Sequence, residues 1–258
     1  MRAAPGAGVA EPTAGAAPAA LRLDGIAHRF GPRWVLRGCS LRVELGEAVA
    51  LIGGNGAGKT TLLRIAATLL RPSRGSGRVL GCELRGEAAR IRGEVGLLGY
   101  SPALYEDLTA AENLRFACRM RGGHADAAAI ARVLDEVGLQ AHAGARVRGF
   151  SSGMRRRVAL ARILLHEPKL LLLDEPYAAF DAEGIELVNT LMRRITSRGG
   201  AVLVATHDLP RASRVIDRLV QMERGLLTEM AWGAEARASW GGGVDESRPL
   251  LRALERVP

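Results

Sequence analysis

The sequence predicts an α/β domain built on a parallel sheet, and three observations support that prediction. Apolar runs occur at residues 48–52 ("AVALI"), 169–175 ("KLLLLDE") and 200–208 ("GAVLVATHD"). Continuous runs of this kind are typical of strands covered on both faces. Stretches with helical spacing lie between them, as the crossover connections of parallel strands require. Glycine and proline mark the boundaries of these segments, which favours strand–helix alternation over a single long helix.

The N-terminal part reads as short strands. "LRLDGIAHRF" and "WVLRGCSLRVELGEAVALIGG" are separated by turn signals at Gly31–Pro32 and Gly46. Residues 1–20 before them are alanine, glycine and proline with few other residues, and they lack a continuous apolar segment. We therefore expect a disordered leader there, and not a signal peptide.

A helical lobe is expected to interrupt the α/β core. "TAAENLRFACRM" opens on a Thr-x-x-Glu capping box, "DAAAIARVLDEVGL" ends at a glycine, and "SSGMRRRVALARILLHEP" begins with a serine cap and stops at a proline. The predicted organisation is one domain over residues 21–230, with a tail over 231–258. Within the domain the core is expected at 21–97 and 166–230, and the lobe at 98–165.

Composition narrows the function classes. The formal net charge is +9, which attracts anions such as nucleotides, nucleic acid or an acidic membrane face. Aromatic residues are only 4% and do not interleave with a basic block, so base-stacking surfaces are not expected. The three cysteines are far apart in sequence, which favours isolated reduced thiols. The longest apolar runs are far short of a bilayer span, so we expect a soluble chain.

The stretch "GGNGAGKTT" (53–61) follows the first apolar run and leads into "TTLLRIAATLL" (60–70), which has helical spacing. It fits the phosphate-loop pattern G-x-x-x-x-G-K-[ST] in the strand–loop–helix context that the pattern requires. Backbone N–H groups unhindered at Gly54, Gly56 and Gly58 would form a concave anion site at a helix N-terminus. The loop therefore predicts phosphate binding.

Lysine is rare in this chain. Of 36 basic residues only Lys59 and Lys169 are lysine, and one of them lies in the glycine loop. A broad, forked guanidinium fits an anion nest poorly, whereas a compact ammonium on a flexible stem can curl over it. Lys59 is expected to meet the β- and γ-phosphates of a nucleotide, and the Thr60 hydroxyl is expected to bind Mg²⁺.

Acidic and imidazole side chains follow the other two apolar runs. Asp174 ends "LLLLD", where its carboxylate can hold Mg²⁺ at the carboxyl edge of the sheet. Glu175 is one residue further on and is a candidate general base for an attacking water. His207 in "VATHD" follows the third run, so we expect it at the same sheet edge, within reach of a γ-phosphate and of Glu175.

A second helix start also favours anion binding. In "FSSGMRRRVALAR" (150–162), Ser151 and Gly153 precede a helix and would present a hydroxyl and exposed amides. One γ-phosphate could be held from both sides if two copies of the chain faced each other.

Together these motifs resemble the ATP-binding subunit of an ABC transporter over residues 21 to about 228. The resemblance implies the ABC-ATPase version of the P-loop NTPase fold, a RecA-like core with an antiparallel β edge and an inserted helical subdomain. Asp174 and Glu175 match the end of Walker B, with Glu175 catalytic, and His207 matches the switch histidine. The Walker A residues expected to bind ATP are Gly53, Gly54, Asn55, Gly56, Ala57, Gly58, Lys59, Thr60 and Thr61.

The remaining family motifs match this sequence less completely. Ser151 and Gly153 match the signature motif, in which Met154 stands where the family has glutamine. Asp181 matches the D-loop, and Phe30 falls where such proteins stack an aromatic ring on adenine. Tyr100 stands where most members have the Q-loop glutamine. The resemblance implies ATP and Mg²⁺ as cofactors, and the two changes, Met154 and Tyr100, are expected to slow turnover without abolishing it.

The stretch around Tyr100, "GYSPALYEDLTAAENLRF", further resembles the haem exporter ATPase of cytochrome c maturation, although that group commonly has histidine here. The expected protein is thus an ATPase that works as a homodimer on the cytoplasmic side of the membrane, with separate membrane-spanning permease subunits and no nucleic acid. The alternatives are an exporter of a drug or lipid, and a nucleic-acid or ribosome-associated ABC ATPase. A plain P-loop kinase or GTPase is disfavoured because the chain lacks a guanine-reading Asn-Lys-x-Asp.

Overall fold

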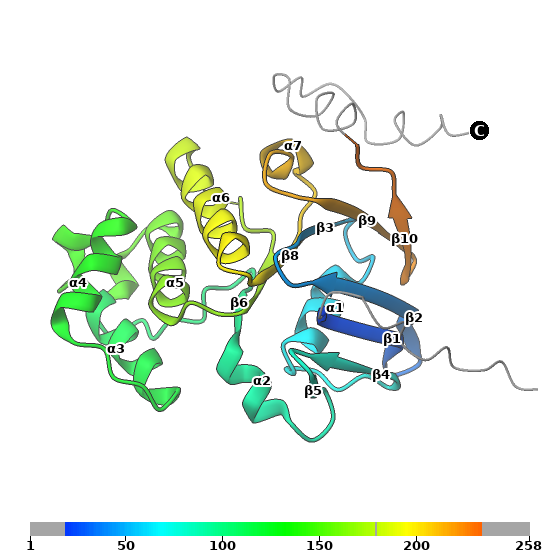
Figure 1. The fold of residues 1–258 in the computed structure, drawn as a ribbon. Coiled ribbons are helices and arrows are strands. Elements are labelled where there is room, and N and C mark those ends of the chain that lie inside the picture. The colour runs from blue at the N-terminus through cyan, green and yellow to red at the C-terminus, as the bar shows by residue number, and fades with distance from the viewer. Residues whose placement is uncertain (1–18, 179, 234–258) are drawn as a thin grey trace, which may run out of the picture.

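The computed structural model describes residues 19–178 and 180–233, whose strands form two sheets (Figure 1). The smaller sheet is antiparallel, and its strand order is β2-β1-β4-β5. It provides the antiparallel β edge that was predicted. Its strands are β1 (Ala19–Phe30), β2 (Arg33–Glu44), β4 (Arg74–Val79) and β5 (Cys82–Glu83).

The larger sheet has the order β10-β9-β3-β8-β7-β6 and is parallel except for the β9–β10 hairpin. The three apolar runs are its central strands β3, β7 and β8, so the predicted α/β fold with a parallel sheet is confirmed. Its strands are β3 (Ala48–Ile52), β6 (Val95–Leu98), β7 (Leu170–Asp174), β8 (Ala201–Ala205), β9 (Arg218–Glu223) and β10 (Leu226–Met230).

Every residue of the three central strands is buried, because the sheet is covered on both faces. Successive side chains of a strand point to opposite faces. In β3, Ala48, Ala50 and Ile52 join one hydrophobic cluster, and Val49 and Leu51 join the other. The first cluster includes buried residues of the helical lobe, and the second includes buried residues of the antiparallel sheet. A continuous apolar sequence is what such a position demands.

Helix α1 (Lys59–Ala66) packs its buried residues into the second cluster and ends four residues before the predicted limit at 70. Thr68 adopts a left-handed backbone with φ 60°. The N–H of Thr68 donates to the Ile65 carbonyl at 2.9 Å, and that of Leu69 donates to the Arg64 carbonyl at 2.8 Å. This pair of bonds is a Schellman motif, which stops a helix although the apolar spacing continues.

The helical lobe lies on one side of the molecule, beyond β6 (Figure 1). The capping box is present, because Thr109 Oγ1 accepts from the N–H of Glu112 and the Glu112 carboxylate accepts from the N–H of Thr109. Ser151 caps α5, which ends just before Pro168 as predicted. The lobe helices are α3 (Ala110–Met120), α4 (Ala127–Glu136) and α5 (Ser152–His166), and the others are α2 (Ala88–Glu94), α6 (Ala182–Ser197) and α7 (Leu209–Ala212).

Four details differ from, or add to, the sequence-based picture. β1 begins at Ala19, inside the expected leader, and the rest of that leader and most of the tail lie outside the described residues. Two short 3₁₀ turns, Gln140–His142 and Val147–Gly149, lie between α4 and α5. The three cysteines are free thiols. Within the described ranges, no helix has the length and apolar character needed to cross a membrane.

Candidate functional site

The glycine loop connects the end of β3 to the start of α1, as predicted. Gly53, Gly56 and Gly58 have φ values of 153°, 77° and 117°, which side-chain-bearing residues rarely adopt. A Cβ at Gly53 would lie 2.3 Å from the Met222 carbonyl oxygen. At Gly54 and Gly56 a Cβ would meet nothing within 4 Å, so these two glycines border open space. A side chain at Gly53 or Gly58 would therefore clash with its neighbours, whereas Gly54 and Gly56 leave open space beside the loop.

Lys59 is the first residue of α1, and its side chain curls back over the loop. Its Nζ donates to the Gly53 carbonyl at 2.6 Å and lies 3.8 Å from Oε1 of Glu175. The residue is only 6% exposed. A guanidinium is wider and planar, so it would not fit this path without displacing the loop. The geometry thus accounts for a lysine at this position in an arginine-rich chain.

Asp174 and Thr60 face each other across the base of the loop. Thr60 and Asp174, the latter at the carboxyl end of β7, line the same cavity. Burial raises the pKa of Asp174, and the neighbouring charge of Glu175 raises it further, while the Thr60 hydroxyl and the Lys59 charge lower it. The sheet edge thereby brings two oxygen-bearing side chains together beside the glycine loop.

Glu175 and His207 are also adjacent. Nδ1 of His207 lies 2.8 Å from Oε2 of Glu175, and the His207 main-chain N–H donates to the same oxygen at 3.3 Å. Glu175 itself has a left-handed backbone, with φ 49°. The expectation that His207 reaches Glu175 at this sheet edge is confirmed by the geometry.

A cavity of about 550 Å³ joins these groups. Its lining includes Tyr100, whose side chain is largely exposed, as well as Asp174, Glu175 and His207. The loop residues that line it are Gly54, Asn55, Gly56, Ala57, Gly58, Lys59, Thr60 and Thr61. Of the residues expected to bind ATP, four besides Gly53 do not line it: Phe30, Ser151, Gly153 and Asp181.

Ser151 and Asp181 instead cap helices of their own chain. Ser151 Oγ accepts from the N–H of Met154 at 3.2 Å, and Asp181 Oδ1 accepts from the N–H of Gly184 at 2.9 Å. The Gly184 N–H and, secondly, Arg157 lower the pKa of Asp181. Phe30 ends β1, is half exposed, and packs edge-on against His28 with ring centroids 4.7 Å apart.

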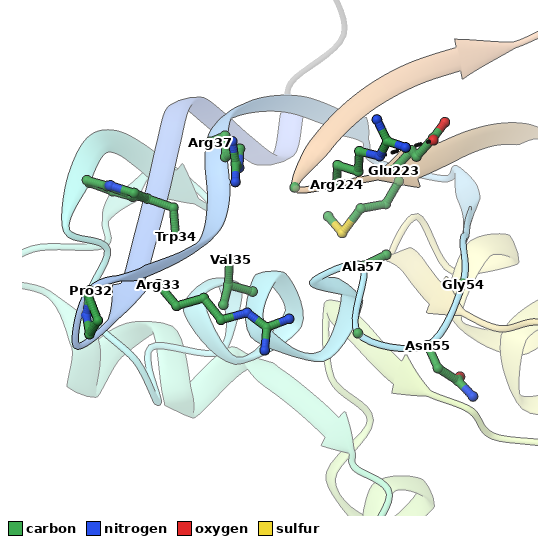
Figure 2. Close-up of a pocket in the computed structure, with 13 residues that line it drawn as sticks. Pro32, Arg33, Trp34, Val35, Arg37, Gly54, Asn55, Ala57, Glu223 and Arg224 are labelled. Carbon is green, nitrogen blue, oxygen red and sulfur yellow. Dashed lines mark ion pairs between the residues drawn. The ribbon is translucent and has the colours of Figure 1, made fainter.

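A second cavity, of about 610 Å³, lies on the other side of the glycine loop, between the start of β2 and the β9–β10 turn (Figure 2). Arg33 extends from β2 toward the loop, and Glu223 and Arg224 form an ion pair at the far wall (Figure 2). Arg33 and Val35 line both cavities, and sequence reasoning missed them. They follow the Gly31–Pro32 turn, and no chemical pattern in the sequence distinguishes them from other strand residues.

Known proteins of similar sequence identify the family to which this chain belongs. The family model described as "ABC transporter" matches residues 36–178. The daunorubicin resistance ATP-binding protein DrrA3 of Streptomyces coeruleorubidus is 36% identical over 228 residues, which cover 88% of this chain and 72% of DrrA3. This chain belongs to the ABC transporter family. It is an ATP-binding subunit of the family and an ABC-type ATPase.

Other ABC relatives have different named roles. The cytochrome c biogenesis ATP-binding export protein CcmA of Methylococcus capsulatus is 38% identical over 189 residues, covering 73% of this chain and 91% of CcmA. The aliphatic sulfonates import ATP-binding protein SsuB 2 of Burkholderia cenocepacia is 41% identical over 212 residues, covering 82% of this chain and 76% of SsuB 2. A drug-resistance protein, an export protein and an import protein are thus similar to this ABC subunit to nearly the same degree.

The fold matches solved ABC cassettes. A dimeric structure of the ATP-binding cassette MJ0796, in a post-hydrolysis state bound to ADP and Pi, has a TM-score of 0.76 and 25% identity. The match covers 83% of this chain and 99% of that chain. The predicted ABC-ATPase fold is therefore confirmed.

Proposed function

We propose that two copies of this chain close on two ATP molecules and that hydrolysis reopens them. In this arrangement Lys59 of one copy and Ser151 and Gly153 of the other hold the same γ-phosphate. The support is geometric: Ser151, Gly153 and Asp181 lie outside the cavity formed by their own chain. A site that needs these residues is completed only by a second copy. The dimeric form of the MJ0796 cassette is in keeping with that arrangement.

Within each site we propose that Glu175 is the general base. Its carboxylate lies at the cavity between the Lys59 ammonium and the His207 imidazole, and this is the observation on which the proposal mainly depends. Glu175 accepts a proton from the attacking water as that water adds to the γ-phosphorus, and the bond to the β-phosphate oxygen breaks. Lys59 stabilises the charge that develops on the phosphate oxygens. His207 fixes the direction of the Glu175 carboxylate.

Mg²⁺ fits the residues present. Among the described residues, no three or more His, Cys, Asp or Glu side chains form a group able to hold a metal by themselves. Mg²⁺ is commonly held by one or two protein oxygens together with phosphate oxygens. The Thr60 hydroxyl and Asp174 carboxylate, from two residues that line the same cavity, are hard oxygen ligands of that kind. We propose that they hold Mg²⁺, which when bound neutralises charge on the β- and γ-phosphates.

The membrane partners are proposed to dock on the Tyr100 loop (residues 99–109, between β6 and α3) and the helical lobe, from the cytoplasmic side. Tyr105 and Phe116 pack edge-on with centroids 4.7 Å apart, and both are partly exposed. The side chains of Tyr100 and Met120 are more than two-thirds exposed. Asn113 holds this region in shape, since its amide accepts from the Tyr105 N–H and donates to the Tyr105 carbonyl, both at 2.9 Å. An exposed aromatic surface on a rigid support suits an apolar partner segment.

For the cargo we propose export, with haem or a haem-related compound as the first candidate. CcmA is named as a cytochrome c biogenesis export protein, and 91% of its length is matched. The second candidate is a drug, as the name of DrrA3 suggests for that protein. Co-purification of this chain with a permease, followed by haem and daunorubicin binding to the complex, separates the two candidates.

The test of the hydrolytic proposal is phosphate release by the purified chain with ATP and Mg²⁺. We expect Glu175→Gln to lower kcat by roughly 100-fold or more, while ATP binding is kept, because a general base contributes on that order. Glu175→Gln should also accumulate as an ATP-dependent dimer on size exclusion. Glu186→Gln, on the exposed side of α6, is the matched control. Unchanged phosphate release in Glu175→Gln would remove Glu175 from this role.

A further inference from the structure

Arg156 lies in α5 with its guanidinium in the interior, at the junction of the lobe and the core. The residue is 5% exposed. Its guanidinium donates to three main-chain carbonyls: those of Tyr100 at 3.3 Å, Asp174 at 3.4 Å, and Glu175. No ion pair formed within the described part of the chain includes it. Its Nε has no hydrogen-bond partner in this structure.

This environment is unfavourable for a positive charge. Desolvation lowers the pKa of Arg156, and the nearby charges of Asp174 and Glu175 only partly oppose that effect. An interior cation that is incompletely hydrogen-bonded destabilises the fold relative to an apolar side chain of similar size. Stability alone therefore does not explain the residue, and its three carbonyl contacts indicate a geometric role.

The bond from Arg156 to Glu175 supports a strained backbone conformation at Glu175. Glu175 has φ 49°, a left-handed backbone that is disfavoured for residues with a Cβ and persists only where neighbours impose it. Three bonds hold it here. The Glu175 N–H donates to the Ala205 carbonyl of β8 at 2.8 Å, and the Glu175 carbonyl accepts from Arg156 and, at 3.3 Å, from the N–H of Ala178. The peptide groups on both sides of the Glu175 Cα are thereby fixed, and with them the direction of its side chain.

We propose that Arg156 is a positioning residue for Glu175: it holds the left-handed backbone that aims the Glu175 carboxylate at His207 and at the water to be activated. The proposal rests on the general-base role proposed above. The guanidinium also holds the Tyr100 carbonyl, so one side chain of α5 fixes both the end of Walker B and the start of the Tyr100 loop. A planar fork with five N–H groups can reach both segments, whereas a lysine ammonium can reach one.

The experiment compares Arg156→Met and Arg156→Lys with the wild-type chain for ATP hydrolysis, affinity for ATP with Mg²⁺, and hydrogen exchange of the peptide spanning residues 172–178. We expect Arg156→Met to lower kcat on the order of 10- to 100-fold, because small misplacement of a catalytic group has effects of that size. KM and ATP affinity should stay within about twofold, since the glycine loop and Lys59 are untouched. Exchange at 172–178 should rise, and Arg156→Lys should restore part of kcat.

Arg162→Met is the matched control. Arg162 is on the same helix and also donates to carbonyls of the Tyr100 loop, those of Ala103 at 3.0 Å and Pro102 at 3.2 Å, but it does not contact Glu175. Its kcat should remain near the wild-type value. The proposal is overturned if Arg156→Met keeps wild-type kcat, or if Arg162→Met lowers kcat equally. Should Arg156→Met fail to fold, Arg156→Lys and Arg156→Gln carry the same comparison. A wild-type chain without ATPase activity would instead refute the proposed function, which separates the two failures.

Discussion

Two contacts from His207 converge on a single carboxylate oxygen, Oε2 of Glu175. The imidazole Nδ1 lies 2.8 Å away, and the His207 main-chain N–H donates to the same atom at 3.3 Å. The other oxygen, Oε1, faces the Lys59 ammonium at 3.8 Å. Each oxygen of Glu175 is thus directed by a different neighbour, and the carboxylate has a defined orientation at the cavity.

Removing the imidazole should therefore impair turnover more than binding. We expect His207→Ala to lower kcat on the order of 10- to 100-fold, because only the main-chain contact would then orient Glu175. ATP affinity should change little. His124→Ala, an exposed histidine outside the cavity, is the control. Single-turnover phosphate release gives the measurement, and an unaltered rate in His207→Ala would show that the imidazole does not orient Glu175.

The two lysines of the chain provide a matched pair. Lys59→Arg should weaken ATP binding at least about 10-fold, because the guanidinium cannot follow the buried path over the loop. Lys169→Arg should have no effect on binding, since Lys169 is exposed and pairs with Glu94 at 3.2 Å on the surface. Calorimetric titration with a nonhydrolysable ATP analogue and Mg²⁺ distinguishes them. Equal affinities in the two variants would contradict the proposal that only a lysine side chain fits the path over the glycine loop.

Two adjacent glycines should differ in their effect on stability. Gly53→Ala places a Cβ against the Met222 carbonyl at a φ of 153°, so we expect a loss of roughly 1–3 kcal/mol in the free energy of unfolding. Gly54→Ala meets no neighbour within 4 Å and should leave that free energy nearly unchanged. Urea denaturation of both variants measures this difference. Equal free energies of unfolding would contradict the prediction.

The lowered pKa of His166 leads us to expect that the free energy of unfolding depends on pH. Burial, and secondly the neighbouring Arg121, lower the pKa of His166 to about 4, while Glu94 acts in the opposite direction. In the unfolded chain the ordinary value is about 6.5. Between pH 6.5 and 4 the unfolded chain therefore binds more protons, and the free energy of unfolding falls as pH falls. His166→Gln should lose less stability over that window, by on the order of 1–2 kcal/mol after allowing for partial exposure. Parallel denaturation curves at pH 7 and pH 4.5 for both chains test this.

The docking proposal predicts a selective loss of permease binding. Phe116→Asp should break the Tyr105–Phe116 pair and abolish co-purification with a permease, while phosphate release by the isolated chain stays at its wild-type rate. Leu226→Asp places the same charge at an exposed apolar position on β10, away from the lobe. If Leu226→Asp disrupts co-purification to the same extent, the lobe is not the docking surface.

The central strands and the glycine loop were predictable because their signals are local. β3 begins and ends at the predicted residues, since an uninterrupted apolar run bounded by glycine fits only a strand covered on both faces. The end of α1 was missed because Thr68 adopts a left-handed backbone that β-branched residues rarely take. No sequence signal marks that exception.

For the site, sequence reasoning identified the residues whose chemistry is distinctive, such as Lys59 and His207. Arg33 and Arg156 were not identified, because arginine is common throughout this chain and only tertiary contacts distinguish these two. The left-handed backbone of Glu175 is likewise held in part by bonds from β8 and α5, which are far away in sequence. Such features depend on the assembled fold.

The alternation within β3 has a practical consequence for anyone dividing this chain. Ala48, Ala50 and Ile52 are covered by elements that come later in sequence, and Val49 and Leu51 by α1 and the antiparallel sheet. A truncated piece ending before β7 would expose one side of β3 to solvent, and a piece starting after α1 would lack β3 altogether. Neither half is a minimal unit for expression, so labelling or crystallisation work should retain the whole span from β1 to β10.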